Sequence, residues 1–115
     1  MISKELLSEV LEVEVFDIVN DKNTPINMFQ YEIKKRMLDG SGIAYREINI
    51  HELAHKCKEW AMSEGWYLSA WFTKNEGAYC DGIKPPNNEE IHTEAKEEPE
   101  AIFKACQWIL ENKDK

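Results

Sequence analysis

The sequence lacks paired cysteines, long apolar runs and an excess of positive charge. Its three cysteines, Cys57, Cys80 and Cys106, form no C-x-x-C pair. Two of them fall on apolar faces of predicted helices, so we expect buried, reduced thiols and an intracellular setting. No apolar run approaches the ~20 residues of a membrane span, and the N-terminal residues show no signal pattern. We therefore expect a cytoplasmic protein.

The chain is acidic, with 22 Asp and Glu against 14 Lys and Arg and a net charge of −8. This charge opposes non-specific binding to nucleic acid or to an anionic membrane, and it favours basic partners. An apolar share of 43%, with 10% of the residues aromatic, is typical of a folded protein rather than a disordered one. At 115 residues the chain predicts a single domain, residues 1–115, with one core.

Residue periodicity predicts an α+β fold in the order helix, three strands, helix, three strands, helix. Residues 1–48 read as an N-terminal helix and a β-meander, and residues 49–112 as an α-β-β-β-α unit. We expect the two main helices to pack together on one face of antiparallel sheets. The expected strands cover residues 12–19, 27–33, 43–48, 66–73, 78–83 and 90–95. The sequence leaves open whether the two halves share one sheet.

One motif has catalytic potential. His51-Glu52-Leu53-Ala54-His55 fits H-E-x-x-H, in which two histidines one helical turn apart bind zinc and the glutamate activates a water molecule. The alternative function that follows is a zinc-dependent metallohydrolase, with His51 and His55 as metal ligands and Glu52 as general base.

The position of this motif favours a different interpretation, without a cofactor and without catalysis. At about 100° per residue, His51 and His55 lie far from the apolar stripe of their helix and should face water. The helix begins after the N-cap Asn49, so Glu52 already suits a capping role. No other histidine or glutamate stands at the spacing of a third zinc ligand.

Three further groups of residues are candidates for binding. Lys34-Lys35-Arg36 is the only dense basic run; it gives a second alternative, a nucleic-acid binder, but a solvated strand end is favoured because the chain is acidic. Trp108 lies off the apolar stripe of the last helix and is a candidate partner-binding residue. Trp66, Tyr67, Trp71 and Tyr79 form either a stacking surface for bases or sugars or, as we favour, the sheet face beneath the helices.

The C-terminal half resembles a known family. Its close, Thr93-Glu94-Ala95-Lys96-Glu97-Glu98-Pro99-Glu100-Ala101, is similar to the phage ABA-sandwich proteins, in which a strand ending in Ala or Thr and an acidic Pro-Glu-Ala start precede the last helix. The resemblance covers residues 49–112. It implies a small cytoplasmic protein of phage or prophage origin, and it brings no activity and no functional residues with it.

The same order of elements is similar to the double-stranded-RNA-binding fold. That family places basic residues at the start of its last helix to contact phosphates. Glu97, Glu98 and Glu100 occupy that position here, so the function does not follow from the fold. The expected function is therefore protein–protein interaction by an acidic, phage-related protein, with an unidentified and preferentially basic partner. The oligomeric state stays open, a homodimer included.

Overall fold

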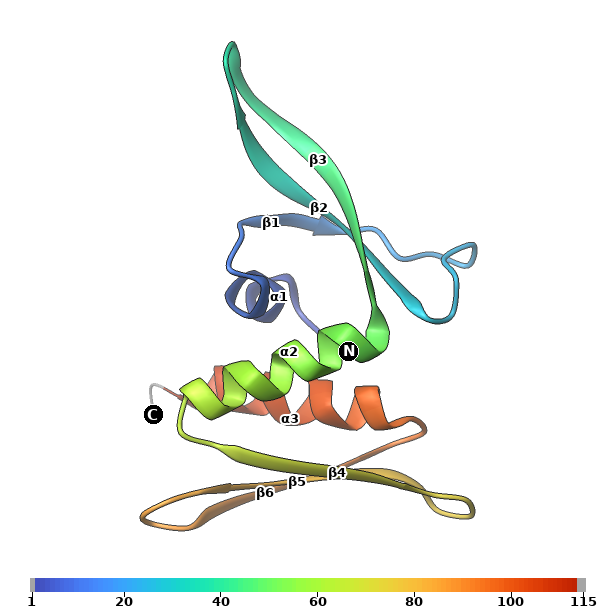
Figure 1. Ribbon diagram of the computed structural model, residues 1–115, viewed down its shortest axis with the longest axis vertical. Coiled ribbons are helices and arrows are strands. Elements are labelled where there is room, and N and C mark those ends of the chain that lie inside the picture. Colours follow the sequence, from blue (N-terminus) through green and yellow to red (C-terminus); the bar gives the residue numbers. More distant parts are fainter. Residues whose placement is uncertain (1, 114–115) are drawn as a thin grey trace.

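The computed structural model describes residues 2–113, which form three helices and two separate three-stranded antiparallel sheets (Figure 1). This confirms the predicted α+β fold and the order of its elements, and it answers the open question, since the two halves do not share a sheet. The elements are α1 (Lys4–Leu11), β1 (Val15–Ile18), β2 (Met28–Met37), β3 (Gly40–Asn49), α2 (Ile50–Ser63), β4 (Tyr67–Thr73), β5 (Gly77–Lys84), β6 (Glu89–Ala95) and α3 (Glu98–Asn112).

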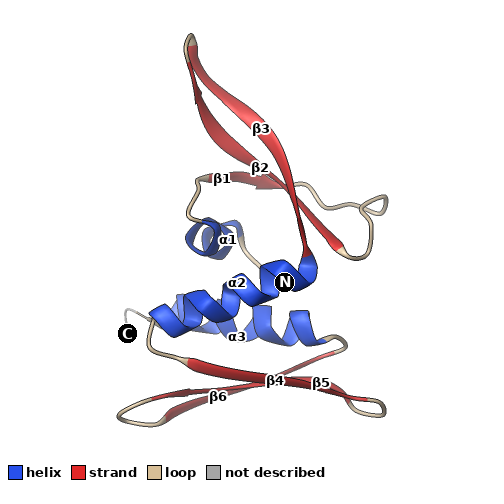
Figure 2. Cartoon of the chain, in the orientation of Figure 1, coloured by secondary structure: helices blue, strands red, loops and turns tan. Residues whose placement is uncertain are grey.

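The molecule is layered along its 50 Å axis. The β4-β5-β6 sheet lies at one end and the β1-β2-β3 sheet at the other, with α2 and α3 side by side between them (Figures 1 and 2). A single cluster of buried side chains joins the layers and includes Leu6 and Leu7 of α1, Leu53 of α2 and Ile109 of α3. The helices thus form the middle of the molecule, and each sheet presents surface at one end.

Each helix begins at a residue suited to a helix start, and for α2 this is the predicted N-cap, Asn49. The Ser3 side chain accepts a hydrogen bond from the Leu6 amide at the start of α1, and Asn49 accepts from the His51 and Glu52 amides at the start of α2. Pro99 occupies the first turn of α3, where it loses no helical hydrogen bond. No helix in the described part of the chain combines the length and the apolar character needed to cross a membrane.

The N-terminal strands differ from the prediction in their bounds. β1 begins at Val15 rather than residue 12, because α1 ends on Glu12 in a left-handed conformation with φ of 57°. β2 continues to Met37 rather than ending at residue 33, and β3 begins at Gly40 rather than residue 43, so the basic run lies within a strand. The contacts of β2 with the preceding segment end with the hydrogen bond from the Lys34 amide to the Glu14 carbonyl, so the hairpin beyond Lys34 is a two-stranded ribbon.

Candidate functional site

The β4-β5-β6 sheet turns its small residues toward the helices. On β5 the buried positions are Ala78, Cys80 and Gly82. A Cβ atom on Gly82 would lie 2.7 Å from Leu68 Cδ2 and 3.4 Å from the Trp66 ring, so a larger residue there would displace the Leu68 side chain. α3 packs on this face and buries Ala101 and other residues of its own. Short side chains on the sheet therefore let the helix approach closely.

α1, α2 and α3 all lie on one side of this sheet, and no described element covers its opposite side (Figure 1). We call this surface the open face. Strand alternation and register place ten residues on it: Tyr67, Ser69, Trp71 and Thr73 of β4, Tyr79, Asp81 and Ile83 of β5, and Glu90, His92 and Glu94 of β6. The open face thus holds three aromatic residues and four acidic or histidine side chains, whereas Leu68 and Ile91 of the same sheet pack against the core.

The favoured interpretation of the four aromatic residues is wrong for three of them. Only Trp66 is buried on the helix side, with 4% of its surface exposed. Tyr67 and Trp71 are 57% and 40% exposed on the open face, and Tyr79 stands opposite Trp71 in the register. The reason is the alternation of side chains along β5: because Ala78 and Cys80 point toward the helices, Tyr79 between them points to the open face.

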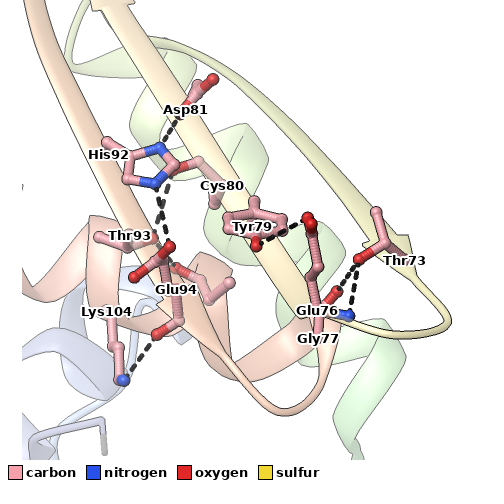
Figure 3. A network of polar contacts seen from close by, with 11 residues as sticks. Thr73, Glu76, Gly77, Tyr79, Cys80, Asp81, His92, Thr93, Glu94 and Lys104 are labelled. Atoms are coloured by element: carbon pink, nitrogen blue, oxygen red, sulfur yellow. Dashed lines mark hydrogen bonds and ion pairs between the residues drawn. The ribbon is translucent and has the colours of Figure 1, made fainter.

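Three ring side chains of the open face, Trp71, Tyr79 and His92, form a row that we call the aromatic row. The Trp71 and Tyr79 rings stack with centroids 5.6 Å apart and an angle of 26° between their planes. The Tyr79 and His92 rings follow at 5.6 Å and 30°. The Tyr79 hydroxyl donates a hydrogen bond to Glu76 Oε2 at 3.2 Å, which fixes the outer edge of the ring (Figure 3). The row offers a π-surface that spans all three strands.

Carboxylates surround the histidine at the end of this row. His92 Nδ1 is hydrogen-bonded to Asp81 Oδ1, and His92 Nε2 lies 3.6 Å from Glu94 Oε1 (Figure 3). The hydrogen bond to Asp81 raises the pKa of His92 above its ordinary value of 6.5, and Glu94 adds to the shift. The site therefore favours a positively charged group held between carboxylates and beside an aromatic ring.

Two hydrogen bonds join β6, an edge strand of the sheet, to α3. The Thr93 hydroxyl, on the helix side of β6, donates to the Ala101 carbonyl of α3 at 2.7 Å. Lys104 Nζ donates to the backbone carbonyl of Glu94 at 2.7 Å (Figure 3). Both contacts hold β6 on α3, so the side chains of His92 and Glu94 project from a fixed strand.

A hollow of about 610 Å³ lies on the sheet beside the aromatic row. Its lining includes Tyr67, Ser69, Asp81, Ile83 and His92, which belong to the open face. Apolar surface from Tyr67 and Ile83 and polar atoms from Asp81 and His92 thus meet in one concavity. This combination suits a ligand group with an apolar stem and a polar or charged end.

The arrangement does not match a hydrolytic triad. Ser69, Asp81 and His92 stand in one row across the three strands, with Asp81 on the middle strand. A serine nucleophile needs the histidine between itself and the carboxylate, so that the imidazole can take the hydroxyl proton. Here the carboxylate occupies the middle position, and the row supports binding better than proton transfer.

The residues of the H-E-x-x-H motif lie on the outer surface of α2. His51, Glu52 and His55 are all exposed, which confirms that both histidine rings face water. His55 Nε2 is 3.5 Å from Glu59 Oε1, one turn further along the helix. A small hollow of about 200 Å³ adjoins both histidines and Glu98 of α3. Within residues 2–113, no three His, Cys, Asp or Glu side chains come together as a metal site requires.

The two other candidate sites lie away from the open face. Trp108 is 40% exposed on α3, and its ring meets that of Trp66 edge-on at 5.8 Å and 84°. Lys34, Lys35 and Arg36 are exposed on β2, where Lys34 forms a 3.0 Å ion pair with Glu14. The structure therefore brings neither group together with the motif histidines.

The sequence interpretation missed Asp81, His92 and Glu94 as a group. Asp81 and His92 are 11 residues apart in the chain and become neighbours only through the register of β5 and β6. Their one sequence signal is the alternation within each strand, which puts His92 on the side opposite Ile91 and Thr93.

Comparison with protein-family models, with curated proteins and with solved structures found no match to this chain.

Proposed function

We propose that this chain is a non-catalytic, phage-related binding protein of the cytoplasm, and that its open face binds a Lys- or Arg-rich segment of a partner protein. The resemblance of residues 49–112 to the phage ABA-sandwich proteins supports the phage relation. The three free, buried cysteines suit a reducing compartment.

The observation that carries the proposal is the cluster of large aromatic side chains exposed on the open face, opposite the small buried residues of β5. A sheet gains stability by burying its large apolar residues and exposing its small or polar ones. This sheet packs Leu68 and Ile91 against the core in the usual way, but β5 buries only Ala78, Cys80 and Gly82, while β4 exposes Tyr67 and Trp71. Folding alone does not favour that choice, and a clustered aromatic surface is typical of an interaction site.

The charge of the open face selects a cationic occupant. Among the strand residues that we place on it, Asp81, Glu90 and Glu94 are acidic and none is Lys or Arg. Lys and Arg side chains stack on aromatic rings with a gain of roughly 0.5–2 kcal/mol each. Carboxylates beside the rings can receive the ammonium or guanidinium group, as Asp81 and Glu94 already receive the imidazole of His92.

The test is a fluorescence-anisotropy titration with labelled octa-arginine at about 0.1 M salt. Trp71→Ala should weaken binding roughly 5- to 30-fold, the range for loss of an aromatic hot spot. Trp108→Ala is the matched control, because Trp108 is also 40% exposed but lies on α3. Asp81→Asn should weaken binding several-fold, while Glu5→Gln on α1 removes one charge elsewhere and should change nothing.

Three results contradict the proposal. One is equal binding of octa-arginine and octa-glutamate. Another is loss of binding in Trp108→Ala with Trp71→Ala unaffected, which would move the site to α3. The third is binding of a neutral oligosaccharide such as maltohexaose in preference to octa-arginine, which would make the open face a sugar-binding surface.

A further inference from the structure

The distal part of the β2–β3 hairpin projects from the body as an arm, which we define as residues 34–43. The register of β2 with β1 ends at Ile33, and one further backbone hydrogen bond joins the Lys34 amide to the Glu14 carbonyl at 3.0 Å. Beyond Lys34 the arm consists of two strands only, in register from Lys35↔Gly42 to Met37↔Gly40. Figure 1 shows the arm at the end of the long axis opposite to the β4-β5-β6 sheet.

The arm exposes apolar side chains that the rest of residues 2–113 leaves half or fully open to solvent. Met37 and Ile43 are about half exposed, and Leu38 at the tip is fully exposed. Tyr45, just below the arm, is 51% exposed on the same side of the ribbon as Ile43. An isolated two-stranded ribbon is marginally stable in water and gains from packing against another surface. These residues therefore have the composition of a contact surface.

The arm is also the basic part of an acidic molecule. Lys34, Lys35 and Arg36 against Asp39 give it a charge of +2, so the rest of the chain carries −10. One of its cations, Lys34, is engaged by Glu14. Lys35 and Arg36 lie on opposite sides of the ribbon, so both of its faces offer a positive charge beside an apolar residue.

We propose that the arm of one copy of this chain occupies the open face of a second copy. The inference rests on the proposed function, because it takes the open face as a site for cationic segments and names the segment. The two surfaces complement each other in charge and in chemistry. Arg36 and Lys35 meet the carboxylates of Asp81, Glu90 and Glu94, and the apolar side chains of the arm meet the aromatic row.

The position of the two surfaces sets the form of the assembly. Arm and open face stand at opposite ends of the 50 Å axis, and the open face looks away from the arm (Figure 1). A contact between two different patches is heterologous, so each added copy leaves one arm and one open face free. Copies therefore associate head to tail and continue beyond a dimer.

Sedimentation velocity from about 1 to 500 µM, a range that covers weak protein contacts, measures this association. For the 13.5 kDa wild-type chain, the weight-average mass should rise with concentration and pass the dimer mass. Raising the salt from about 0.05 to 0.5 M should lower it, since the charges that meet are exposed.

Two variants separate the surfaces. The arm variant, Arg36→Glu with Leu38→Ser, changes two exposed side chains, and the face variant, Trp71→Ala with Glu94→Lys, alters the open face alone. Far-UV circular dichroism checks that each is folded. Each variant alone should stay monomeric. Mixed in equal amounts they should form a 1:1 dimer and nothing larger, because only one functional arm and one functional face remain to pair.

The inference is overturned if the wild type stays monomeric across the range, if it stops at a dimer, or if the mixed variants do not pair. It is also overturned if the arm variant associates as the wild type does. Binding of octa-arginine separates these failures from failure of the proposed function, because the arm variant keeps its open face. If the wild type is monomeric but binds a DNA duplex, and the arm variant does not, the arm is a nucleic-acid contact instead.

Discussion

Truncation of two tryptophans, Trp66 and Trp71, tests whether the second sheet has the two faces described above. Trp66 is 4% exposed and its ring meets Trp108 edge-on, so Trp66→Ala removes a buried ring and leaves a cavity. Such a change costs about 3–5 kcal/mol of unfolding free energy. Trp71→Ala removes one stacking contact, with Tyr79, which is worth about 0.5–1.5 kcal/mol. Because Trp71 is exposed to water, its removal leaves no buried cavity.

We therefore expect Trp71→Ala to cost about 1–2 kcal/mol, which is about 1–4 kcal/mol less than Trp66→Ala. For a domain of this size, each 1 kcal/mol of that difference corresponds to a gap of roughly 3–6 °C in Tm. Urea titrations followed by far-UV circular dichroism give both values, since this signal does not depend on the tryptophan removed. Equal losses, or a larger loss for Trp71→Ala, would refute the assignment of the two faces.

Three more expectations follow from the polar groups, the thiols and the motif histidines. Since the pKa of His92 is raised in the folded state, its contribution to stability is complete below pH 6.5 and is lost as the pH rises through the folded value. An NMR titration of His92 should show that raised pKa, and Asp81→Asn should lower it; an unchanged midpoint in the variant would contradict the contact. Because burial raises the pKa of Cys80 to about 12 and all three cysteines are buried, a thiol reagent at pH 8 should label the native chain far more slowly than the urea-unfolded chain. Protein purified without a histidine tag should contain sub-stoichiometric zinc that His51→Ala leaves unchanged, whereas one zinc per chain that His51→Ala removes would support the metallohydrolase alternative.

The helices could be predicted well from the sequence because their signals are local. Ser3, Asn49 and Pro99 mark helix starts through contacts within one turn, and the apolar stripes follow the helical period. These signals do not depend on how the rest of the chain folds.

The strands carried less information about which side is buried. In β5, Ala78, Cys80 and Gly82 alternate with Tyr79, Asp81 and Ile83. Alternation defines two faces, and the usual preference for burying large residues chooses the wrong one here. The deciding fact is tertiary: α3 packs on the side of this sheet where Ala78, Cys80 and Gly82 lie.

The arm and the histidine site were beyond sequence reasoning for a related reason. The basic run predicts a solvated strand end, but the free length of the ribbon depends on where β1 stops pairing, at Ile33. The contact between His92 and Asp81 depends on the register of β5 with β6. Where β1 stops pairing and how β5 aligns with β6 are both properties of strand pairs, and the sequence of a single strand does not determine them.

The most direct test of the open face as a binding surface is an amide NMR titration of the arm variant with octa-arginine. The account predicts that the shifted resonances concentrate in β4, β5 and β6, with the largest changes near Trp71, Tyr79 and His92. Changes centred on His51 and His55 of α2 or around Trp108 of α3, or no changes at all, would contradict it.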